Sequence, residues 1–261
     1  MREFQYKKIY KDLLTPEIVA LVAQIHEYKG EQTLFIEANT DMLSQLMEIA
    51  KIQSTEASNK IEGIFISDER LKKIVRDKTM PRTRNEEEIA GYRDVLAMIH
   101  ESHDFIPPIP SVFLQLHRDL YKFSGKSIGG TNKSTDNVIE EVDTQGNTFV
   151  RFRPVAAWET PEAMERLSTT LSGISKFTEY DPLLLTPIFI LDFLCIHPFN
   201  DGNGRMSRLL TLLLLYRSGY IVGKYISIEK LIETSKETYY EALQRSSEGW
   251  HEEKNDYQKS V

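Results

Sequence analysis

The sequence of 261 residues contains one cysteine, Cys195, so it cannot form a disulfide within the chain. Because no disulfide calls for an oxidising compartment, we expect a cytoplasmic protein. Long hydrophobic runs are also lacking: Pro187, Asp192 and Arg217 interrupt the apolar stretches well short of the roughly 20 residues that a membrane-spanning helix needs. The first residues lack the apolar core of a signal peptide. No membrane partner is therefore expected.

An excess of basic residues is absent as well. The 32 Lys and Arg residues are outnumbered by 39 Asp and Glu residues, which gives a formal net charge of -7. Since nucleic acids attract strongly basic surfaces, we do not expect a nucleic-acid partner. The chain is 41% hydrophobic and 27% charged, which is ordinary for a globular protein and excludes long disordered stretches.

Most of the sequence has helical periodicity. Apolar residues three and four apart predict a helix from Pro16 to about Lys29, with Thr15 as its N-cap. A longer helix is predicted from about Thr40 to Ile61, and Gly63 follows where a left-handed residue often ends a helix. Ser67 is the expected N-cap of the next helix.

A capping-box pattern of Asn85 and Glu88 predicts a further helix, on which His100 and His103 lie three residues apart. These two histidines could ligate a metal, but no Cys or acidic residue at zinc spacing accompanies them, so we interpret them as surface histidines. The segment Ser124-Gly-Lys-Ser127 resembles a phosphate-binding loop. Its first glycine would have to be at position 120, which is a leucine, so the loop is interpreted as ordinary.

The proline-rich segment at 105–110 divides the sequence into an N-terminal helical region, 1–109, and a second region, 110–261. In the second region, residues 137–154 alternate in polarity around a polar turn, which predicts a β-hairpin. Helical patterning resumes at Pro161 and continues toward the end. The sequence therefore predicts a mainly α fold with one small hairpin, the two regions packing as one unit.

One polar segment, His197-Pro-Phe-Asn-Asp-Gly-Asn-Gly-Arg-Met-Ser-Arg208, lies between two apolar helical runs that we expect in the core. An ordinary turn would explain Gly202 and Gly204 but leaves the histidine and the two arginines without a reason. A helix that begins near Asn203 would offer free N–H groups to an anion, and the two glycines would let a phosphate approach the backbone.

The charged residues of this segment suit the same ligand. Arg205 and Arg208 are three residues apart on one helix face and could hold further phosphates, while Asp201 and phosphate oxygens together are typical ligands of Mg²⁺. His197 is the nearby group whose ordinary pKa suits a general base.

The twelve residues match the HPFx[DE]GNGRxxR signature of the Fic-domain family, and the resemblance extends over roughly residues 5 to 255. It implies a helical core with a β-hairpin flap, and transfer of AMP from Mg-ATP to a Ser, Thr or Tyr hydroxyl of a target protein. The resemblance also assigns roles by position: His197 as base, Asp201 as metal ligand, Asn203 and Gly204 at the α-phosphate, Arg205 as a phosphate contact and Arg208 as clamp of the γ-phosphate. One of Tyr239 and Tyr240 would border the adenine, and we assign Tyr240 to that place.

A second resemblance concerns Ser58-Asn-Lys-Ile-Glu62-Gly63, which fits the inhibitory pattern [ST]xxxE[GN] of the same family; the alternative is an ordinary helix end. It implies that Glu62 pairs with Arg208 and occupies the guanidinium meant for ATP. The flap residues Val138 and Ile139 would bind an extended target segment through a strand edge, unless the hairpin is an ordinary solvent-exposed one. The family's flap entry often carries an arginine where this chain has Thr131-Asn-Lys-Ser134.

Three alternatives stay open from the sequence. The same fold can transfer phosphocholine, UMP or phosphate; the same site can remove AMP, with Glu62 aligning a water; and the chain can be a non-catalytic nucleotide-binding regulatory module. A homodimer is a further partner that the sequence leaves open. Relatives often continue beyond the point where this chain ends, at Val261, so we expect that it is cut short relative to them.

Overall fold

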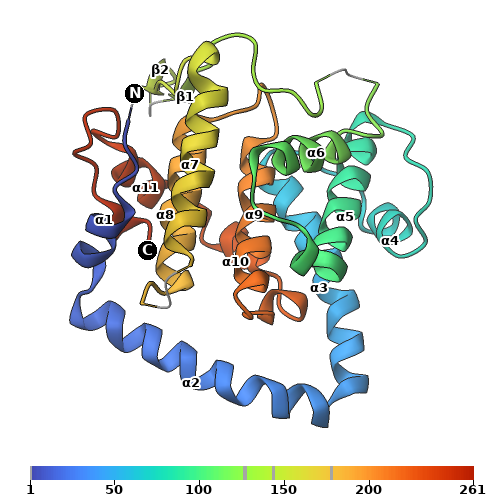
Figure 1. Ribbon diagram of the computed structural model, residues 1–261. Helices are drawn as coiled ribbons and strands as arrows, with labels where there is room; N and C mark the ends of the chain where they lie inside the picture. The colour runs from blue at the N-terminus through green and yellow to red at the C-terminus, as the bar shows by residue number, and fades with distance from the viewer. Residues whose placement is uncertain (1, 126–127, 143–144, 177–178) are drawn as a thin grey trace.

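The computed structural model describes residues 2–125, 128–142, 145–176 and 179–261. Two adjoining helices, α8 (Pro182–Ile196) and α9 (Asn203–Arg217), lie at its centre (Figure 1). Most residues of α8 are buried because the helix carries apolar side chains on all of its faces. Six residues separate the end of α8 from the start of α9. The mainly α fold predicted from the sequence is confirmed.

The other helices surround this pair. They are α1 (Tyr6–Leu13), α2 (Pro16–Ala38), α3 (Thr40–Ile61), α4 (Asp68–Val75), α5 (Arg84–Ser102), α6 (Pro110–Leu120), α7 (Thr160–Ile174), α10 (Ile228–Thr234) and α11 (Lys236–Ser247), with short 3₁₀ turns at His103–Phe105, Ala157–Glu159, Val222–Lys224 and Tyr257–Lys259. One hydrophobic core takes residues from both sides of the expected boundary at 109/110, for example Tyr6 and Leu96 together with Phe189 and Leu209. The boundary itself stays a prediction.

The first two long helices agree with the sequence in type but not in every bound. The Thr15 hydroxyl accepts a hydrogen bond from the Ile18 N–H, so this residue is the N-cap of α2 as predicted. Helix α2 continues to Ala38 instead of ending near Lys29, because Gly30 keeps a helical conformation. Helix α3 has the predicted bounds, and the left-handed φ of 76° at Gly63 turns the chain directly after it.

The predicted cap of α5 is wrong by two residues. Thr83, not Asn85, is the N-cap, and its hydroxyl accepts from the Glu86 N–H. The Asn85 amide instead donates to the Phe65 carbonyl at 2.9 Å, which fixes the turn before α4. The Asn85 side chain, which the local pattern assigned to the N-cap of α5, thus makes a tertiary hydrogen bond to Phe65 instead.

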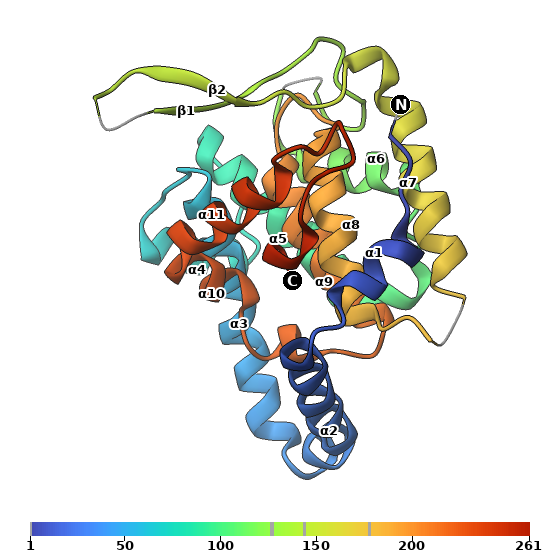
Figure 2. The ribbon, with the colours of Figure 1, turned by 90° about the vertical axis from the view of Figure 1, so that its left-hand side faces the viewer.

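The predicted hairpin is present as the antiparallel strands β1 (Ile139–Val142) and β2 (Thr148–Phe152). Ile139 lies opposite Phe152, and Glu141 lies opposite Phe149, with a register irregularity between Ile139 and Glu140. Figure 2 shows the hairpin as an arm that extends beyond the helices. Phe152, at its base, packs against the hydrophobic core.

A buried carboxylate ties the two ends of the described chain to α8. Asp192 is fully buried and accepts hydrogen bonds from the Tyr6 hydroxyl, the Trp250 indole and the Tyr257 hydroxyl at 2.9, 2.7 and 2.7 Å. The guanidinium of Arg2 lies 4.7 Å above the Trp250 ring. Removal of the carboxylate would leave three buried donors unpaired, each of which costs about 1–3 kcal/mol.

The interpretation of His100 as a surface residue is wrong. It is 3% exposed, and its Nε2 atom lies 3.2 Å from the Tyr216 hydroxyl. The reason is that α5 packs against both α3 and α9, so it has little free surface. Burial, together with the positive charges of Lys51 and Lys224, lowers the pKa of His100 to about 3.

None of the helices in the described part of the chain has the length and apolarity that a bilayer crossing requires.

The buried histidine predicts a pH dependence of stability. Because the folded-state pKa of His100 is about 3 and the ordinary value is about 6.5, the unfolded state binds one more proton between these values. The free energy of unfolding should therefore fall by about 1.4 kcal/mol per pH unit on acidification through this window. We expect His100→Gln to remove this part of the slope in urea unfolding at pH 6, 5 and 4. Equal slopes for His100→Gln and the control His251→Gln would contradict the prediction.

Candidate active site

The polar segment singled out in the sequence forms the loop 197–202 between α8 and α9, and α9 begins at Asn203 as expected. His197 ends α8 with a left-handed φ of 54°, and Gly202 precedes α9 with a φ of 83°. Helix α9 therefore points the N–H groups of its first turn toward the end of α8 at which the imidazole lies. These N–H groups have no intrahelical acceptor and together form a potential anion-binding site.

The imidazole of His197 is held in one tautomer. Its Nδ1 atom lies 3.2 Å from the Leu194 carbonyl, and because a carbonyl only accepts, Nδ1 carries the proton and Nε2 keeps a free lone pair. Burial lowers the pKa of His197 to about 4, with Lys133 also lowering it while the Leu194 carbonyl and Glu62 raise it. At neutral pH the ring is thus uncharged and able to accept a proton.

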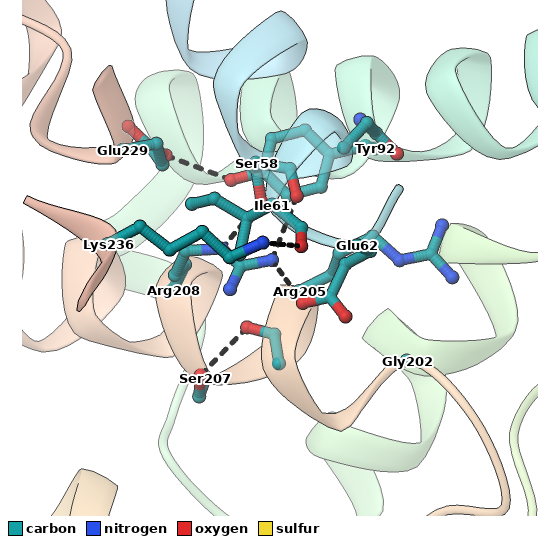
Figure 3. A network of polar contacts seen from close by, with 12 residues as sticks. Ser58, Ile61, Glu62, Tyr92, Gly202, Arg205, Ser207, Arg208, Glu229 and Lys236 are labelled. Atoms are coloured by element: carbon teal, nitrogen blue, oxygen red, sulfur yellow. Dashed lines mark hydrogen bonds and ion pairs between the residues drawn. The ribbon is translucent and has the colours of Figure 1, made fainter. Parts of the chain in front are cut away.

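The guanidinium of Arg208 is buried against helix α3. It donates to the Ser58 hydroxyl at 2.8 Å, to the Ser58 carbonyl at 2.9 Å and to the Glu62 carboxylate at 2.7 Å (Figure 3). The side chain of Arg208 is 3% exposed and that of Glu62 32% exposed. Glu62 and Arg208 are thus in contact in the structure, and the Ser58 contacts fix the direction of the guanidinium.

Glu62 lies directly after the last residue of α3, where the chain turns at Gly63. The Lys236 ammonium donates to the Ile61 carbonyl at 3.1 Å and so holds this helix end in place. A Cβ atom at Gly204 would collide with the Glu62 carboxylate, which shows that the carboxylate rests on the first turn of α9. The Glu62 carboxylate therefore occupies the potential anion-binding site at the N-terminus of α9.

A polar network behind Arg208 was not predicted from the sequence. The Tyr92 hydroxyl donates to Glu229 at 2.9 Å (Figure 3). Ser54 donates at 2.9 Å to Ser227, whose hydroxyl contacts the same carboxylate. Glu229 is 1% exposed. Tyr92 of α5 and Ser54 of α3 are far from Glu229 in the sequence, and no local signal could have revealed them.

Arg205, which the sequence places one helix turn from Arg208, has different partners. Its side chain is 2% exposed and contacts Glu88 at 2.9 Å and the Tyr121 hydroxyl at 2.7 Å. In Figure 3 its guanidinium points away from Arg208. Two of its nitrogens, Nε and Nη1, have no hydrogen-bond partner within the described ranges. The geometry thus does not bring Arg205 to the ion pair, and its contact with a phosphate stays a prediction.

Asp201 is the most exposed charged residue of the loop, with a side chain that is 47% exposed. One of its carboxylate oxygens accepts from the Gly202 N–H at 2.7 Å, so the carboxylate has a fixed direction and a second oxygen to offer. No cluster of three His, Cys, Asp or Glu side chains that could hold a metal is found among residues 2–125, 128–142, 145–176 and 179–261. A metal at Asp201 would therefore take most of its ligands from its substrate and from water.

A single cavity brings several predicted residues together. Glu62, His197 and Gly204 line it with Tyr240 from α11 and with Val138 and Ile139 from the hairpin. Burial raises the pKa of the Tyr240 hydroxyl to about 12. The sequence reasoning missed the remaining lining residues, which are Arg151, Phe152, Leu191, Leu194, Cys195, Leu243 and Ser247.

Comparison with known proteins gives this arrangement a family. The Fic/DOC family model matches residues 108–215. A protein adenylyltransferase Fic from Aedes aegypti is 48% identical over 119 residues, which are 43% of this chain and 23% of that protein. A Fido domain-containing protein from Dictyostelium discoideum is 37% identical over 92 residues, which are 33% of this chain and 58% of that protein.

The fold agrees over a longer range than the sequence. The crystal structure of a Fic family protein from Desulfovibrio desulfuricans superposes with a TM-score of 0.74 at 25% identity, over 95% of this chain and 70% of that one. The matched residues 108–215 contain the loop, His197 and Arg208, while Glu62 and α3 lie outside them. Residues 108–215, which contain the loop that carries the signature, are therefore identified as a Fic domain, and the chain shares its architecture with a Fic family protein.

Proposed function

We propose that this protein is a protein adenylyltransferase, which transfers AMP from Mg-ATP to a Ser, Thr or Tyr hydroxyl of a target protein. One observation carries the proposal: the free Nε2 of a neutral His197 lies in the same cavity as Gly204, at the N-terminus of α9. A proton acceptor beside an anion-binding site is the arrangement that phosphoryl-type transfer requires. The names of the relatives support the same activity.

The residues of the chain divide the work of this reaction. His197 Nε2 accepts the proton of the target hydroxyl while that oxygen bonds to the α-phosphorus of ATP. The bond from the α-phosphorus to the bridging oxygen breaks, and pyrophosphate leaves. The backbone N–H groups at Asn203 and Gly204 receive the α-phosphate, and Arg208 holds the γ-phosphate.

Magnesium and the adenine have their own candidate residues. Asp201 would hold Mg²⁺, which neutralises charge on the phosphates when bound. Gly202 turns the chain so that the phosphates can approach, and Tyr240 borders the adenine in the cavity. Arg205 could contribute a phosphate contact through the guanidinium nitrogens that lack a partner.

Glu62 would keep the enzyme inactive. Its carboxylate occupies the Arg208 guanidinium and rests on Gly204, so the phosphates of ATP meet a negative charge in the place that they need. Because charge-assisted hydrogen bonds contribute about 1.5–3 kcal/mol each, we expect productive ATP binding to be strongly disfavoured until Glu62 moves. Ser58 and Gly63 belong to the same regulatory element, since one fixes Arg208 and the other turns the chain after Glu62.

The target would bind along the hairpin. Val138 and Ile139 line the cavity that contains His197, and an extended segment paired with the strand edge would place its hydroxyl there. A cytoplasmic location and a homodimer stay predictions, as does the division into an N-terminal region 1–109 and a core 110–261.

The first test removes the inhibitory carboxylate. Glu62→Gly should raise AMP transfer from labelled ATP by about 100-fold, which corresponds to about 2.7 kcal/mol. Glu62→Gln, which keeps the shape and loses the charge, should fall between Glu62→Gly and the unchanged chain. The surface variant Glu69→Gly is the control. Equal transfer by the unchanged chain and Glu62→Gly would remove the inhibitory role.

The second test removes the base. In the Glu62→Gly background, His197→Ala should lower kcat by about 1,000-fold because no other group replaces the proton acceptor. Retained Mg-ATP binding by calorimetry would show that the site is intact. A Glu62→Gly protein that binds Mg-ATP but modifies no hydroxyl would favour a non-catalytic module, and AMP release from a modified target would favour the reverse reaction.

The third test concerns the metal. Asp201→Asn in the Glu62→Gly background should raise the Mg²⁺ concentration for half-maximal transfer by about tenfold, since the remaining oxygen ligands are neutral or belong to ATP. A titration of Mg²⁺ at fixed ATP measures this, with Asp12→Asn as control. An unchanged midpoint for Asp201→Asn would exclude Asp201 as the metal ligand.

A further inference from the structure

One side chain of α6 and two from the segment that leads into the hairpin hold carbonyl groups of the loop 197–202 and of Ile196, the last residue of α8. Lys133 Nζ donates to the Ile196 carbonyl at 3.0 Å, and Asn137 Nδ2 donates to the Phe199 carbonyl at 3.2 Å. The His117 ring contacts the Asp201 carbonyl at 3.0 Å. We call His117, Lys133 and Asn137 the loop cradle.

Lys133 holds the peptide group that precedes His197 and the one that follows Pro198. In addition to the ammonium contact with Ile196, its backbone N–H donates to the Pro198 carbonyl at 2.8 Å. His197 has a left-handed φ of 54°, which costs an L-residue about 1–2 kcal/mol. Such a conformation persists only where the surroundings impose it. Lys133 supplies that constraint, and with it the direction of the imidazole.

The Lys133 ammonium also supplies a hydrogen-bond donor to a carbonyl group at the C-terminus of α8. The last carbonyls of a helix lack intrahelical partners, and a cation near the C-terminus interacts favourably with them. Lys133 is 3% exposed, so water cannot replace it there. Burial lowers the pKa of Lys133 to about 8, while the charge of Asp136 raises it, so most of the ammonium is charged at neutral pH.

His117 supports the other half of the loop. Its Nδ1 accepts from the Gly130 N–H at 3.1 Å, so its Nε2 carries the proton and donates to the Asp201 carbonyl. Its ring lies parallel to the Phe199 ring, with centroids 3.8 Å apart and planes 5° apart. The loop is thus held from Ile196 to Asp201 by a segment that is not part of it.

The same segment continues into the hairpin. The Lys133 ammonium also donates to the Asn137 side-chain carbonyl at 2.9 Å, and Asn137 directly precedes Val138, which lines the cavity. A displacement of the hairpin base would therefore move two of the three residues that hold the loop. The position of the loop and the position of the hairpin are coupled through Lys133 and Asn137.

We propose that His117, Lys133 and Asn137 are positioning residues for the transfer reaction, and that they couple the target-binding hairpin to the orientation of His197. The inference rests on the proposed function, because it assumes that His197 is the base. The Lys133 ammonium acts on the proton acceptor through the Ile196 carbonyl, in the peptide group that precedes His197, and Lys133 does not line the cavity. Loss of the ammonium should therefore impair the chemical step more than the binding of ATP.

The test uses Lys133→Met in the Glu62→Gly background. We expect kcat for AMP transfer to fall about tenfold or more, since small misplacements of reacting groups cost factors of this order, while the KM for ATP changes by less than about twofold. Lys122→Met is the matched control, because Lys122 is a partly exposed lysine that pairs with Asp94. Asn137→Ala, which breaks one contact and keeps the ammonium, should give a smaller loss of kcat.

Hydrogen exchange gives a readout independent of activity. Amides of residues 199–203 should exchange about tenfold faster in Lys133→Met than in Lys122→Met, while those of α7 remain unchanged. Unchanged exchange in the loop would overturn the proposal, and so would a kcat within about twofold of the parent. If Lys133→Met proves unfolded by thermal denaturation, Asn137→Ala decides on both readouts. If the Glu62→Gly parent itself transfers no AMP, the proposed function fails, and loop exchange still decides whether the cradle holds the loop.

Discussion

Helix α8 is apolar on all sides and ends inside the molecule, so its last carbonyl groups cannot turn to water. Every group that satisfies them has to come from the chain itself. This constraint explains why a buried lysine donates to the Ile196 carbonyl. The loop that follows has partners of its own: the His117 ring stacks on Phe199, and Asn203 bonds back to the Phe199 peptide at 3.0 and 2.8 Å. The loop that carries His197 is ordered because its surroundings leave it no other arrangement.

The same rule applies to the charges. A guanidinium as buried as that of Arg208 needs an anionic partner, and Glu62 on the neighbouring helix provides it. Under the proposed function, an incoming phosphate would be a second partner for the same group. The ion pair then acts as a competitor of the nucleotide, and Ser58 and Lys236 set the strength of that competition by fixing the two ends of the contact.

Local patterns in the sequence were sufficient for much of this architecture. The bounds of α3, the start of α9 and the hairpin follow from periodicity, capping and turn residues, each of which acts within a few positions. The cavity could be anticipated in part, because Glu62, His197 and Tyr240 each belong to a recognisable motif. The structure adds that these three residues, far apart along the chain, line one cavity.

The remaining features depend on partners that no local pattern reveals. Lys133 and His117 lie 63 and 84 positions from the carbonyls that they contact. The Glu88 partner of Arg205 was available only once α5 packed against α9, and the same packing buried His100. Residue propensities and sequence spacing predict the local structure of a segment. The contacts of Lys133, His117 and Arg205 depend instead on which other segments pack against their own.

The carboxylate of Asp192 has an effect beyond stability. Trp250, which it binds, follows α11 after two residues, and α11 carries the Tyr240 side of the cavity. Asp192 itself lies one turn before the end of α8. Asp192 therefore connects the helix that leads to His197 with the segment that follows α11. Tyr6 and Arg2 lie against the same carboxylate, so residues at the start of the chain support two helices that line the cavity, although they do not line it themselves.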